Sequence, residues 1–510
     1  MKANPILRLL AAITAAVLAT TTLTQAPATA ADDVHQVPLE GGRLASGAWA
    51  SWPYTQIDSS GNSTLERRRA EFNPPLGNNI RTSADGQAVE IVTRRHCTRT
   101  WTDPLVAGAS GNESVAPCPQ GMKTRYSSGR IVLSEKYALT GQWDVTVTAQ
   151  MPANPVAGTR TAVWMYDELG VNSHLPEAGY CSPVQESTNL FEIDLVEWYG
   201  TSKYRDRPVL GMFVGCDMKP DGSKQYSAAS TTVWQSPGWH QQPHTFHASF
   251  DGATVRHTID GVTMQETTVS GPWRTTSPAP ARWQAATQHK LVLWLQGEVF
   301  GGSATQQDKM ITAVDDAADF PLQISRFEQV RLGKPAMALT TVDATMQGAA
   351  VVGEPVTVTT RTAETGAKVT HRWLRNGQPI SGATQARYTA KANDAGHQLD
   401  VVVTATADGK PARSRLLQAG TVLKRVPVKV SIKGTKKPKR GSTVKAAVTV
   451  PTGTRVTYQW LRNGKRISQA TKAKYTVSSK DKRKRITVRV TVHKAGYASN
   501  TKTAPARTVR

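Results

Sequence analysis

Three carboxylates stand close together in residues 192–197, which read Glu-Ile-Asp-Leu-Val-Glu. Aliphatic residues are interleaved with the acids, as expected for a β-strand with one polar and one apolar face. Two carboxyl groups on one face of a sheet can act on a glycosidic bond, one as nucleophile and the other as general acid and base. The alternative is a solvated strand surface with three acids, which would crowd like charges.

Regular alternation along a strand does not place all three acids on one face. Glu192 and Asp194 are two residues apart and share a face, whereas Glu197 is five residues from Glu192 and would lie on the opposite face. One extra residue in the strand, a β-bulge, would return Glu197 to the side of the other two, and bulges are common beside active sites. We therefore predict a bulged strand with all three carboxylates on one side.

Residues 31–335 must supply the sheet that positions these acids. This region contains many short alternating apolar runs, separated by turn signals such as Asp85-Gly86 and Asp260-Gly261. No long segment in it shows helical periodicity. This pattern is typical of a large β-sandwich, and we predict a β-jelly-roll catalytic domain with a concave face suited to an extended polymer.

Two C-terminal segments repeat with an offset of 87 residues. Residues 373–377 (WLRNG) reappear as 460–464, and Asp394 matches Asp481. Alternating apolar runs and Asn-Gly turns predict strands and hairpins in both units. Residues 336–423 and 424–510 resemble immunoglobulin-like β-sandwich domains without the usual cysteine pair, with Trp373 and Trp460 in their cores. The whole chain is therefore expected to be all-β.

The net charge of +24 belongs to the last of these segments. Residues 424–510 hold 25 Lys and Arg and one acid, Asp481, whereas the other 423 residues hold 37 residues of each sign. Such a density of positive charge attracts polyanions. For an exported protein we expect an anionic cell-wall polymer, an acidic polysaccharide or a membrane surface as the partner, and no specific nucleic acid. The alternative is a soluble basic spacer.

The first 30 residues have the pattern of a secretion signal. The basic residues Lys2 and Arg8 accompany an apolar run, and Ala28-Thr29-Ala30 fits the rule for a cleavage site. We predict a signal peptide over 1–30 and a secreted, extracellular protein. No transmembrane segment is expected, because the apolar run is too short to span a membrane.

Four cysteines occur in the chain: Cys97, Cys118, Cys181 and Cys216. An even number of cysteines in an exported chain suggests two disulfides. Chain order favours Cys97–Cys118 and Cys181–Cys216, although three pairings are possible. No CxxC pair supports metal ligation instead.

The acid motif and the segments around it resemble glycoside hydrolase family 16, a group of endo-acting enzymes with a β-jelly roll. The resemblance also rests on residues 128–131, 161–165, 244–261 and 320–332. It implies that Glu192 is the nucleophile, that Asp194 positions it, and that Glu197 is the general acid and base. The implied function is a secreted, retaining hydrolase of β-linked polysaccharide, with β-1,3 or mixed-linkage glucan as the first candidate and no required cofactor.

Four residues are candidate substrate contacts: Trp164, Trp283, Trp294 and His244. Sugar rings stack on flat aromatic faces, although each Trp could instead fill the core and the His could be structural. Members of the family often carry a structural calcium ion. Glu328 stands where an Asp would be expected, so the metal is left open. We expect a monomer.

Three functions stay open. A retaining hydrolase and a transglycosylase would use the same site, and a non-catalytic carbohydrate-binding or cell-wall adhesion protein would use it without chemistry. Relatives of the last kind typically lose one of the two glutamates, and both are present here. Residues 155–161 lack the Trp-Pro of many β-1,3-glucanases, so a galactan or agar-type substrate is a further alternative.

Overall fold

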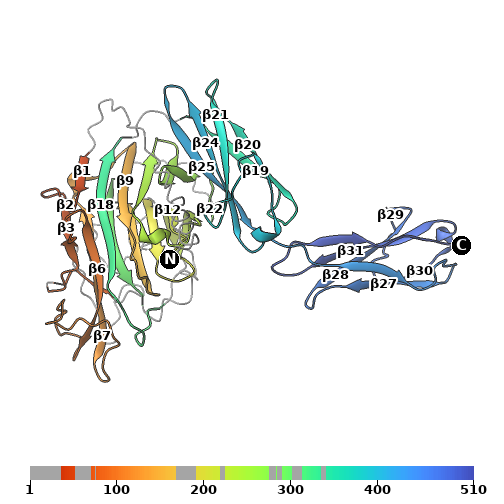
Figure 1. The fold of residues 1–510 in the computed structure, drawn as a ribbon, viewed down its shortest axis with the longest axis horizontal. Helices are drawn as coiled ribbons and strands as arrows, with labels where there is room; N and C mark the ends of the chain where they lie inside the picture. Colours follow the sequence, from red (N-terminus) through yellow and green to blue (C-terminus); the bar gives the residue numbers. More distant parts are fainter. Residues whose placement is uncertain are drawn as a thin grey trace, which may run out of the picture. The chain divides into compact units, whose positions relative to one another are not determined.

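The computed structural model describes residues 36–51, 70–74, 76–167, 191–218, 224–274, 283, 290–300, 313–334 and 340–510. These residues form β-strands joined by turns and short 3₁₀ segments, so the all-β prediction is confirmed (Figure 1). The predicted signal peptide lies outside the described residues. The described part of the chain contains no helix with the length and apolar character that a membrane span requires.

One face of the N-terminal sandwich is a seven-stranded sheet with the order β13-β12-β11-β10-β17-β8-β3. Its strands are β3 (Trp49–Ser51), β8 (Arg130–Leu133), β10 (Thr159–Asp167), β11 (Phe191–Tyr199), β12 (Val209–Met218), β13 (Lys224–Thr232) and β17 (Leu291–Val299). Neighbouring strands are antiparallel. The acid motif is in β11, which lies between β10 and β12 inside the sheet.

The second layer of this sandwich belongs to a 15-stranded sheet that continues into the first repeat. Its N-terminal strands are β1 (Gln36–Glu40), β2 (Arg43–Leu44), β4 (Ala70–Phe72), β5 (Ile80–Thr82), β6 (Val89–Thr98), β7 (Lys123–Ser128), β9 (Trp143–Gln150), β14 (His244–Phe250), β15 (Val255–Ile259), β16 (Val262–Thr267) and β18 (Gln323–Gly333). Asp260 and Gly261 turn β15 into β16 with φ of 49° and 73°, the left-handed conformation that an Asp-Gly hairpin requires. Two layers of this kind are consistent with the predicted jelly roll.

Alternate residues of both layers fill one core. Trp143 and Val147 of β9 point inward from one sheet, and Ile193 and Leu210 point inward from the other. Burying each such side chain contributes about 1.5–3 kcal/mol. Because these apolar residues must face the core, the polar residues that alternate with them on β11 are forced to the outer face of the seven-stranded sheet.

A disulfide joins Cys97 of β6 to Cys118, with the two Cα atoms 5.3 Å apart. This pairing is the one that chain order predicts, and it is confirmed. Cys181 and the side chain of Cys216 lie outside the described residues, so their pairing stays a prediction.

Each C-terminal repeat is built from two facing sheets. The strands of the first repeat are β19 (Asp343–Gln347), β20 (Pro355–Arg361), β21 (Lys368–Arg375), β22 (Gln378–Pro379), β23 (Arg387–Thr389), β24 (Gln398–Ala407) and β25 (Lys410–Thr421). Those of the second are β26 (Lys429–Lys433), β27 (Thr443–Thr449), β28 (Arg455–Arg462), β29 (Lys465–Arg466), β30 (Lys474–Thr476), β31 (Arg485–His493), β32 (Asn500–Thr503) and β33 (Arg507–Thr508). Trp373 and Trp460 are fully buried in the two cores, as predicted. The immunoglobulin-like assignment and the domain boundaries stay predictions.

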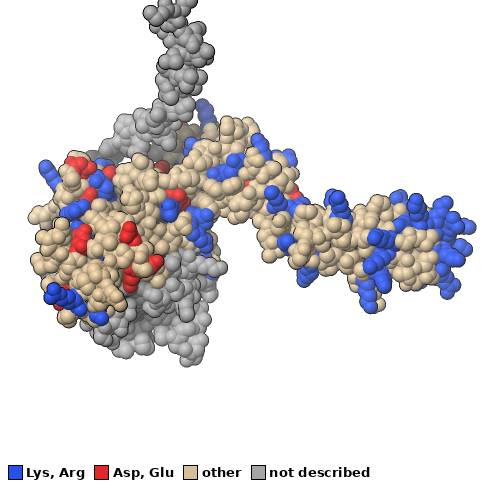
Figure 2. All heavy atoms as spheres, turned by 60° about the horizontal axis from the view of Figure 1, so that its bottom comes forward, with Lys and Arg blue, Asp and Glu red and all other residues tan. Residues whose placement is uncertain are grey.

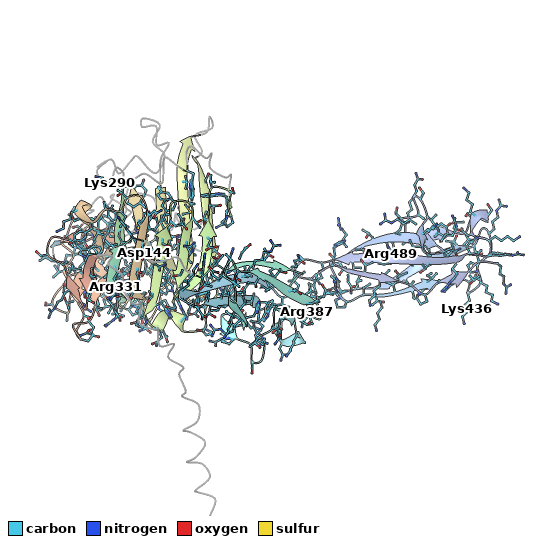
Figure 3. All side chains as sticks on the ribbon, turned by 90° about the horizontal axis from the view of Figure 1, so that it is seen from above. Asp144, Lys290, Arg331, Arg387, Lys436 and Arg489 are labelled. Atoms are coloured by element: carbon cyan, nitrogen blue, oxygen red, sulfur yellow. A yellow bond between two sulfur atoms is a disulfide. The ribbon has the colours of Figure 1, made fainter. Side chains whose placement is uncertain are left out.

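The two repeats differ in surface charge. Lys and Arg side chains gather over the second repeat (Figure 2). Among the labelled side chains, Lys436 and Arg489 lie on this repeat and Arg387 on the first (Figure 3). The same fold therefore carries two different surfaces.

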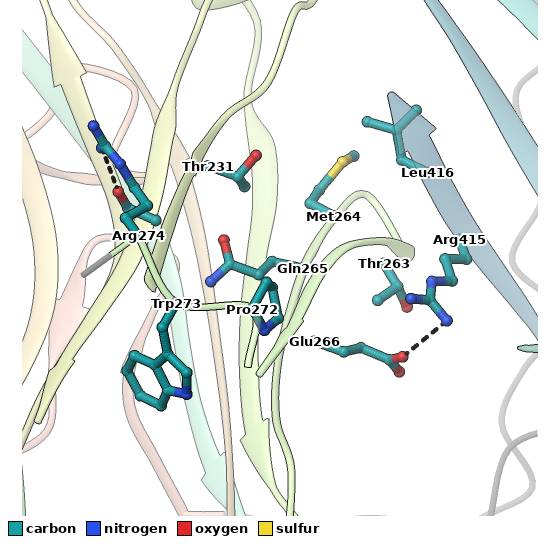
Figure 4. A pocket seen from close by; sticks show the side chains of 11 residues that line it. Thr231, Thr263, Met264, Gln265, Glu266, Pro272, Trp273, Arg274, Arg415 and Leu416 are labelled. Carbon is teal, nitrogen blue, oxygen red and sulfur yellow. Dashed lines mark hydrogen bonds and ion pairs between the residues drawn. The ribbon is translucent and has the colours of Figure 1, made fainter. Parts of the chain in front are cut away.

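The N-terminal sandwich and the first repeat are joined edge to edge. β16 and β25 run parallel, with Thr263 opposite Arg415. Glu266 accepts a hydrogen bond from Arg256 Nε at 2.8 Å and forms ion pairs with Arg413 and Arg415. A hollow of about 310 Å³ lies beside this joint, with Trp273 on its wall (Figure 4). The sequence did not predict this pairing of strands.

Candidate functional site

A β-bulge in β11 turns its three carboxylates to one side. Val196 and Asp194 pair with consecutive residues of β10, at positions 163 and 164, so Leu195 is the extra residue. The register of β11 against β12 shifts in the same interval. Leu195 and Val196 both point into the core, and Glu197 therefore returns to the side of Asp194. The bulge that we predicted from the acid spacing is confirmed.

The three acids differ in their access to solvent. Glu197 is half-buried, with a side-chain exposed fraction of 16%, whereas Glu192 and Asp194 are buried, with whole-residue exposed fractions of 9% and 3%. The short Asp is thus the most enclosed of the three, and the longer Glu side chains flank it. A ligand on this face would meet the two glutamates first.

The surroundings of Asp194 perturb its ionisation. Burial, followed by the negative charges of Glu192 and Glu197, raises the pKa of Asp194 well above its usual range, while the charge of Arg160 acts in the opposite direction. A carboxyl group with a raised pKa keeps its proton to a higher pH than usual, and while protonated it can donate a hydrogen bond to a neighbouring carboxylate.

Arg160 of β10 links two acids on the same face. Its guanidinium forms ion pairs with Glu197 and with Glu298 of β17, whose side chain is fully buried. Burial would lower the pKa of Arg160, but the charges of Glu298 and Glu197 raise it well above its usual value. Arg160 therefore stays charged and ties β11 to β17 through β10.

The hydrogen bonds to Glu197 converge on one of its oxygens. Arg160 Nη1 and the hydroxyl of Tyr199 both donate to Oε1, the latter at 3.3 Å. No residue in the described ranges donates to Oε2. The contacts thus fix the carboxyl group and leave Oε2 as the oxygen that can reach a ligand.

Sequence reasoning missed both Arg160 and Tyr199. Arg160 lies in residues 155–161, the segment that departs from the family pattern, and this departure was an available signal. Tyr199 follows Glu197 by two residues, so strand alternation alone places it on the same face.

Two of the predicted aromatic contacts lie beside the acids. Trp164 is paired with Asp194 across the strands and stacks on Trp294, with ring centroids 5.4 Å apart and an interplanar angle of 17°. The guanidinium of Arg130 lies over Trp294, 4.9 Å from its centroid. The exposed fractions of Trp164 and Trp294 are only 8% and 4%. The pair is thus a wall with little exposed ring surface, and its contact with substrate stays a prediction.

The other two predicted contacts do not lie on this face. Trp283 is buried in the core between the sheets, edge-on to Phe191 and Phe250. His244 is on β14 in the other sheet, where Nδ1 bonds to Asp260 Oδ2 at 2.7 Å and Nε2 bonds to the Trp239 carbonyl at 2.9 Å. Both residues therefore lie away from the three acids, and their predicted contact with substrate stays untested. Trp283 fills the core between the two sheets, and hydrogen bonds to Asp260 and to the Trp239 carbonyl hold His244.

The question of a metal ion stays open. Within the described residues, no group of three or more His, Cys, Asp or Glu side chains is arranged to hold a metal. The structural calcium ion that the family resemblance allows stays untested.

Comparison with known proteins finds likeness only among solved structures. No protein-family model matches the chain, and no curated protein matches it. The laminarinase catalytic domain from Thermotoga maritima is 16% identical over 59% of this chain and 97% of its own, with a TM-score of 0.39. The endo-β-1,3-glucanase from Pyrococcus furiosus is 15% identical over 59% and 92%, with a TM-score of 0.38. The β-glucanase of Bacillus licheniformis is 12% identical over 60% and 99%, with a TM-score of 0.36. The function of this chain must therefore be judged from its own site.

Proposed function

We propose that this protein is an endo-acting, retaining glycoside hydrolase that cleaves a β-linked polysaccharide, with β-1,3 or mixed-linkage glucan as the first candidate. The observation that supports this most directly is the bulge that brings Glu192, Asp194 and Glu197 to one face. A retaining mechanism uses two carboxyl groups that lie roughly 5–5.5 Å apart. The proposal requires the carboxyl groups of Glu192 and Glu197, on either side of the short Asp, to approach each other to that separation.

In the proposed first step, Glu192 attacks the anomeric carbon and forms a glycosyl ester while the glycosidic bond breaks. Glu197 gives its proton to the departing oxygen. In the second step, Glu197 takes a proton from water, and the water oxygen displaces Glu192 from the sugar. The product keeps the anomeric configuration of the substrate because the carbon is inverted twice.

The surroundings of the three acids suit these two reaction steps. With Asp194 protonated, the three acids carry one negative charge before the first step, on Glu192, and one after it, on Glu197. Arg160 would stabilise the later carboxylate, since it already contacts Glu197. Glu298 gives Arg160 a second partner, so the ionisation of Glu197 is not needed to balance the guanidinium.

A substrate panel tests the proposal. Laminarin, lichenan, agarose and galactan would be incubated with the full chain, and new reducing ends would be counted, with NMR of the first anomer released. We expect cleavage of at least one β-glycan with retention, and its loss in Glu192→Gln. Cleavage of none of them, or equal activity in the variant, would contradict the proposal.

Two further features belong to the same proposal. The Cys97–Cys118 disulfide supports an oxidising, extracellular setting, and we expect a monomer, which sedimentation of the purified protein would check. A transglycosylase would use the same residues, and the ratio of transfer to hydrolysis at high acceptor concentration would distinguish it. Anchoring to an anionic wall polymer is a separate property, argued below.

A further inference from the structure

We propose that one end of the second repeat binds an extended anionic glycopolymer, a chain of sugar or polyol units with a carboxylate or a phosphodiester on each repeat unit. This surface, the basic end, consists of the exposed Lys and Arg side chains of loops 436–440 and 480–485 together with Lys433, Lys445 and Lys474. This binding goes beyond the proposed hydrolysis, because it involves a different surface and a charged partner.

The two basic loops form one surface because the last residues of the chain lie between them. The backbone N–H of Arg510 donates to the Pro438 carbonyl at 2.9 Å, and the N–H of Arg483 donates to the Val509 carbonyl at 3.1 Å. Loop 436–440 and loop 480–485 are thus held on either side of residues 507–510. Their nine Lys and Arg side chains are all exposed, and they share one field.

A row of three lysines extends this surface onto a sheet. Lys433 of β26 is directly opposite Lys445 of β27, which is directly opposite Lys474 of β30. Directly opposed residues of antiparallel strands have Cα atoms about 4.5–5.5 Å apart, and like charges at such positions are destabilising. The row lies at the end of the sheet where β26 runs into loop 436–440. An anionic ligand would convert this repulsion into binding.

The first repeat shows that the fold does not require these cations. The corresponding row is Gln347, Thr357 and Arg387, with the same strand pairing. In the loop, Gly396 of the first repeat has φ of 83°, and Arg483 of the second has φ of 57° at the matching position. This left-handed conformation favours glycine over any residue with a Cβ. The second repeat therefore carries charge at positions where stability favours other residues.

The charges of the basic end are not neutralised from within. Asp481, the only acid of residues 424–510, is fully buried. Its carboxylate accepts hydrogen bonds from Arg462 Nε at 2.5 Å, from the Tyr475 hydroxyl at 2.7 Å and from the backbone N–H of Ser478 at 2.7 Å. Among the residues that the structure describes, no acid forms an ion pair with a cation of the basic end. The surface is available to an external anion.

The placement of the aromatic residues of this repeat favours a glycopolymer over a single-stranded nucleic acid as the ligand. Bases are held by exposed aromatic rings, but Trp460 is buried and Tyr475 is half-buried. Tyr497 is exposed, but it follows the last residue of β31, whereas the first residue of that strand, Arg485, belongs to the basic end. Tyr497 is therefore at the opposite end of the strand from the basic end. Recognition by charge alone fits a flexible polyanion, and the proposed action on a β-glycan places the protein beside sugar polymers.

A graft between the repeats tests the inference. The variant Lys480→Asn, Lys482→Ala, Arg483→Gly, Lys484→His, Arg485→Gln gives the loop the residues of positions 393 and 395–398, and removes five positive charges. Its matched control replaces five exposed cations of the first repeat by Gln: Arg361, Lys368, Arg372, Arg387 and Lys391. The full chain, the graft and the control would be titrated with labelled polygalacturonate, poly(glycerol phosphate), neutral dextran and single-stranded DNA at two salt concentrations.

We expect the full chain to bind at least one of the two anionic glycopolymers, and to bind it more weakly as salt rises. The graft should lose at least about tenfold in affinity and show a shallower salt dependence, while the control stays within about threefold. Binding of only one glycopolymer identifies the anionic group. Equal losses in graft and control, binding to neither glycopolymer, equal binding of dextran, or tighter binding of DNA would each overturn the proposal. Hydrolysis of a neutral soluble glucan by the same variants keeps this outcome separate from that of the catalytic proposal.

Discussion

Asp194 in the N-terminal sandwich and Asp394 in the first repeat are both buried, but their surroundings are opposite. Asp394 accepts hydrogen bonds from Arg375 Nε at 2.7 Å, from the Tyr388 hydroxyl at 2.8 Å and from the Lys391 N–H at 2.6 Å. Burial alone would raise the pKa of Asp394, but these donors outweigh it and lower the pKa. The matching residue of the second repeat, Asp481, has the same arrangement and also has a lowered pKa.

Asp194 lies between two other acids instead, and its pKa is raised. Donors around a buried carboxylate stabilise the ion and the fold together. Acids around a buried carboxyl group make ionisation costly, and such perturbed groups cluster at functional sites. The difference indicates that Asp394 and Asp481 serve structure and that Asp194 serves the candidate site.

The strongest test of this contrast is the loss of activity. Glu192→Gln removes the proposed nucleophile and Glu197→Gln removes the proposed acid and base, so we expect each to lower kcat by at least about a thousandfold. Asp481→Asn, in the second repeat, should leave kcat unchanged. Initial rates of reducing-end release would measure all three. A fall in kcat for Asp481→Asn as large as that for Glu192→Gln would contradict the division between site and structure.

The second test concerns stability. Asp394→Ala leaves the guanidinium of Arg375, whose side chain is 34% exposed, without its carboxylate and removes three hydrogen bonds. We expect a loss of about 3 kcal/mol in the free energy of unfolding of the first repeat. Urea unfolding followed by the fluorescence of Trp373 would measure it. Tyr388→Phe, which removes one hydrogen bond, should cost about 1 kcal/mol, and equal effects of the two variants would contradict the interpretation.

The third test is pH, where the two aspartates should act in opposite directions. The lowered pKa of Asp394 means that its stabilisation is present above 3.8, the ordinary pKa of Asp, and is lost as pH falls below it. The raised pKa of Asp194 means that it destabilises the folded protein as pH rises above 3.8, and has no such effect below that value.

The corresponding variants separate the two effects. Compared with the unmodified protein, Asp194→Asn should have a higher Tm at pH 7.5 and an equal Tm at pH 3.5. Asp394→Asn should have a lower Tm at pH 7.5, and the deficit should shrink on acidification. Differential scanning calorimetry at the two pH values would show both trends, and parallel trends for the two variants would refute the assignment.

The residues themselves explain how far the sequence could predict this molecule. The spacing of Glu192, Asp194 and Glu197 predicts the bulge because strand alternation is local and strict. The Asn-Gly pairs of the repeats predict the hairpins, where Asn376 and Asn463 have φ of 48° and 47°. These features depend on neighbours in the chain.

The unpredicted features depend on distant partners. Arg160 contacts Glu197 and Glu298, which lie on two different strands, and no local pattern indicates which acids a strand arginine will meet. The parallel joint of β16 with β25 has no sequence signal either, since parallel pairing leaves no turn between the strands. Trp283 has a flat aromatic ring on which a sugar could stack, and only the packing of the two sheets places this residue in the core.

The smallest expected effect is at Asp400, which differs between the repeats. Asp400 is fully buried on β24, accepts one hydrogen bond from Gln398 at 2.8 Å, and has no partner for Oδ2 among the described residues. Burial raises its pKa to about 7. The matching residue of the second repeat is Thr487, which pairs with Leu461 as Asp400 pairs with Leu374.

Asp400→Thr should therefore stabilise the first repeat in a pH-dependent way. Below pH 3.8 the carboxyl group is protonated in both folded and unfolded chains, so removing it brings no gain from its titration. Between pH 3.8 and about pH 7, Asp400 is ionised in the unfolded chain but still protonated in the folded one. The destabilisation that Asp400 causes therefore grows over this pH range and levels off above it. After the lost hydrogen bond from Gln398 is subtracted, we expect a net gain of about 1 kcal/mol at pH 8. Urea unfolding at pH 8 and pH 4 would measure it, with Thr404→Ser on the same strand as a control. A gain that is the same at both pH values would show that repacking, and not the titration of Asp400, separates the two repeats here.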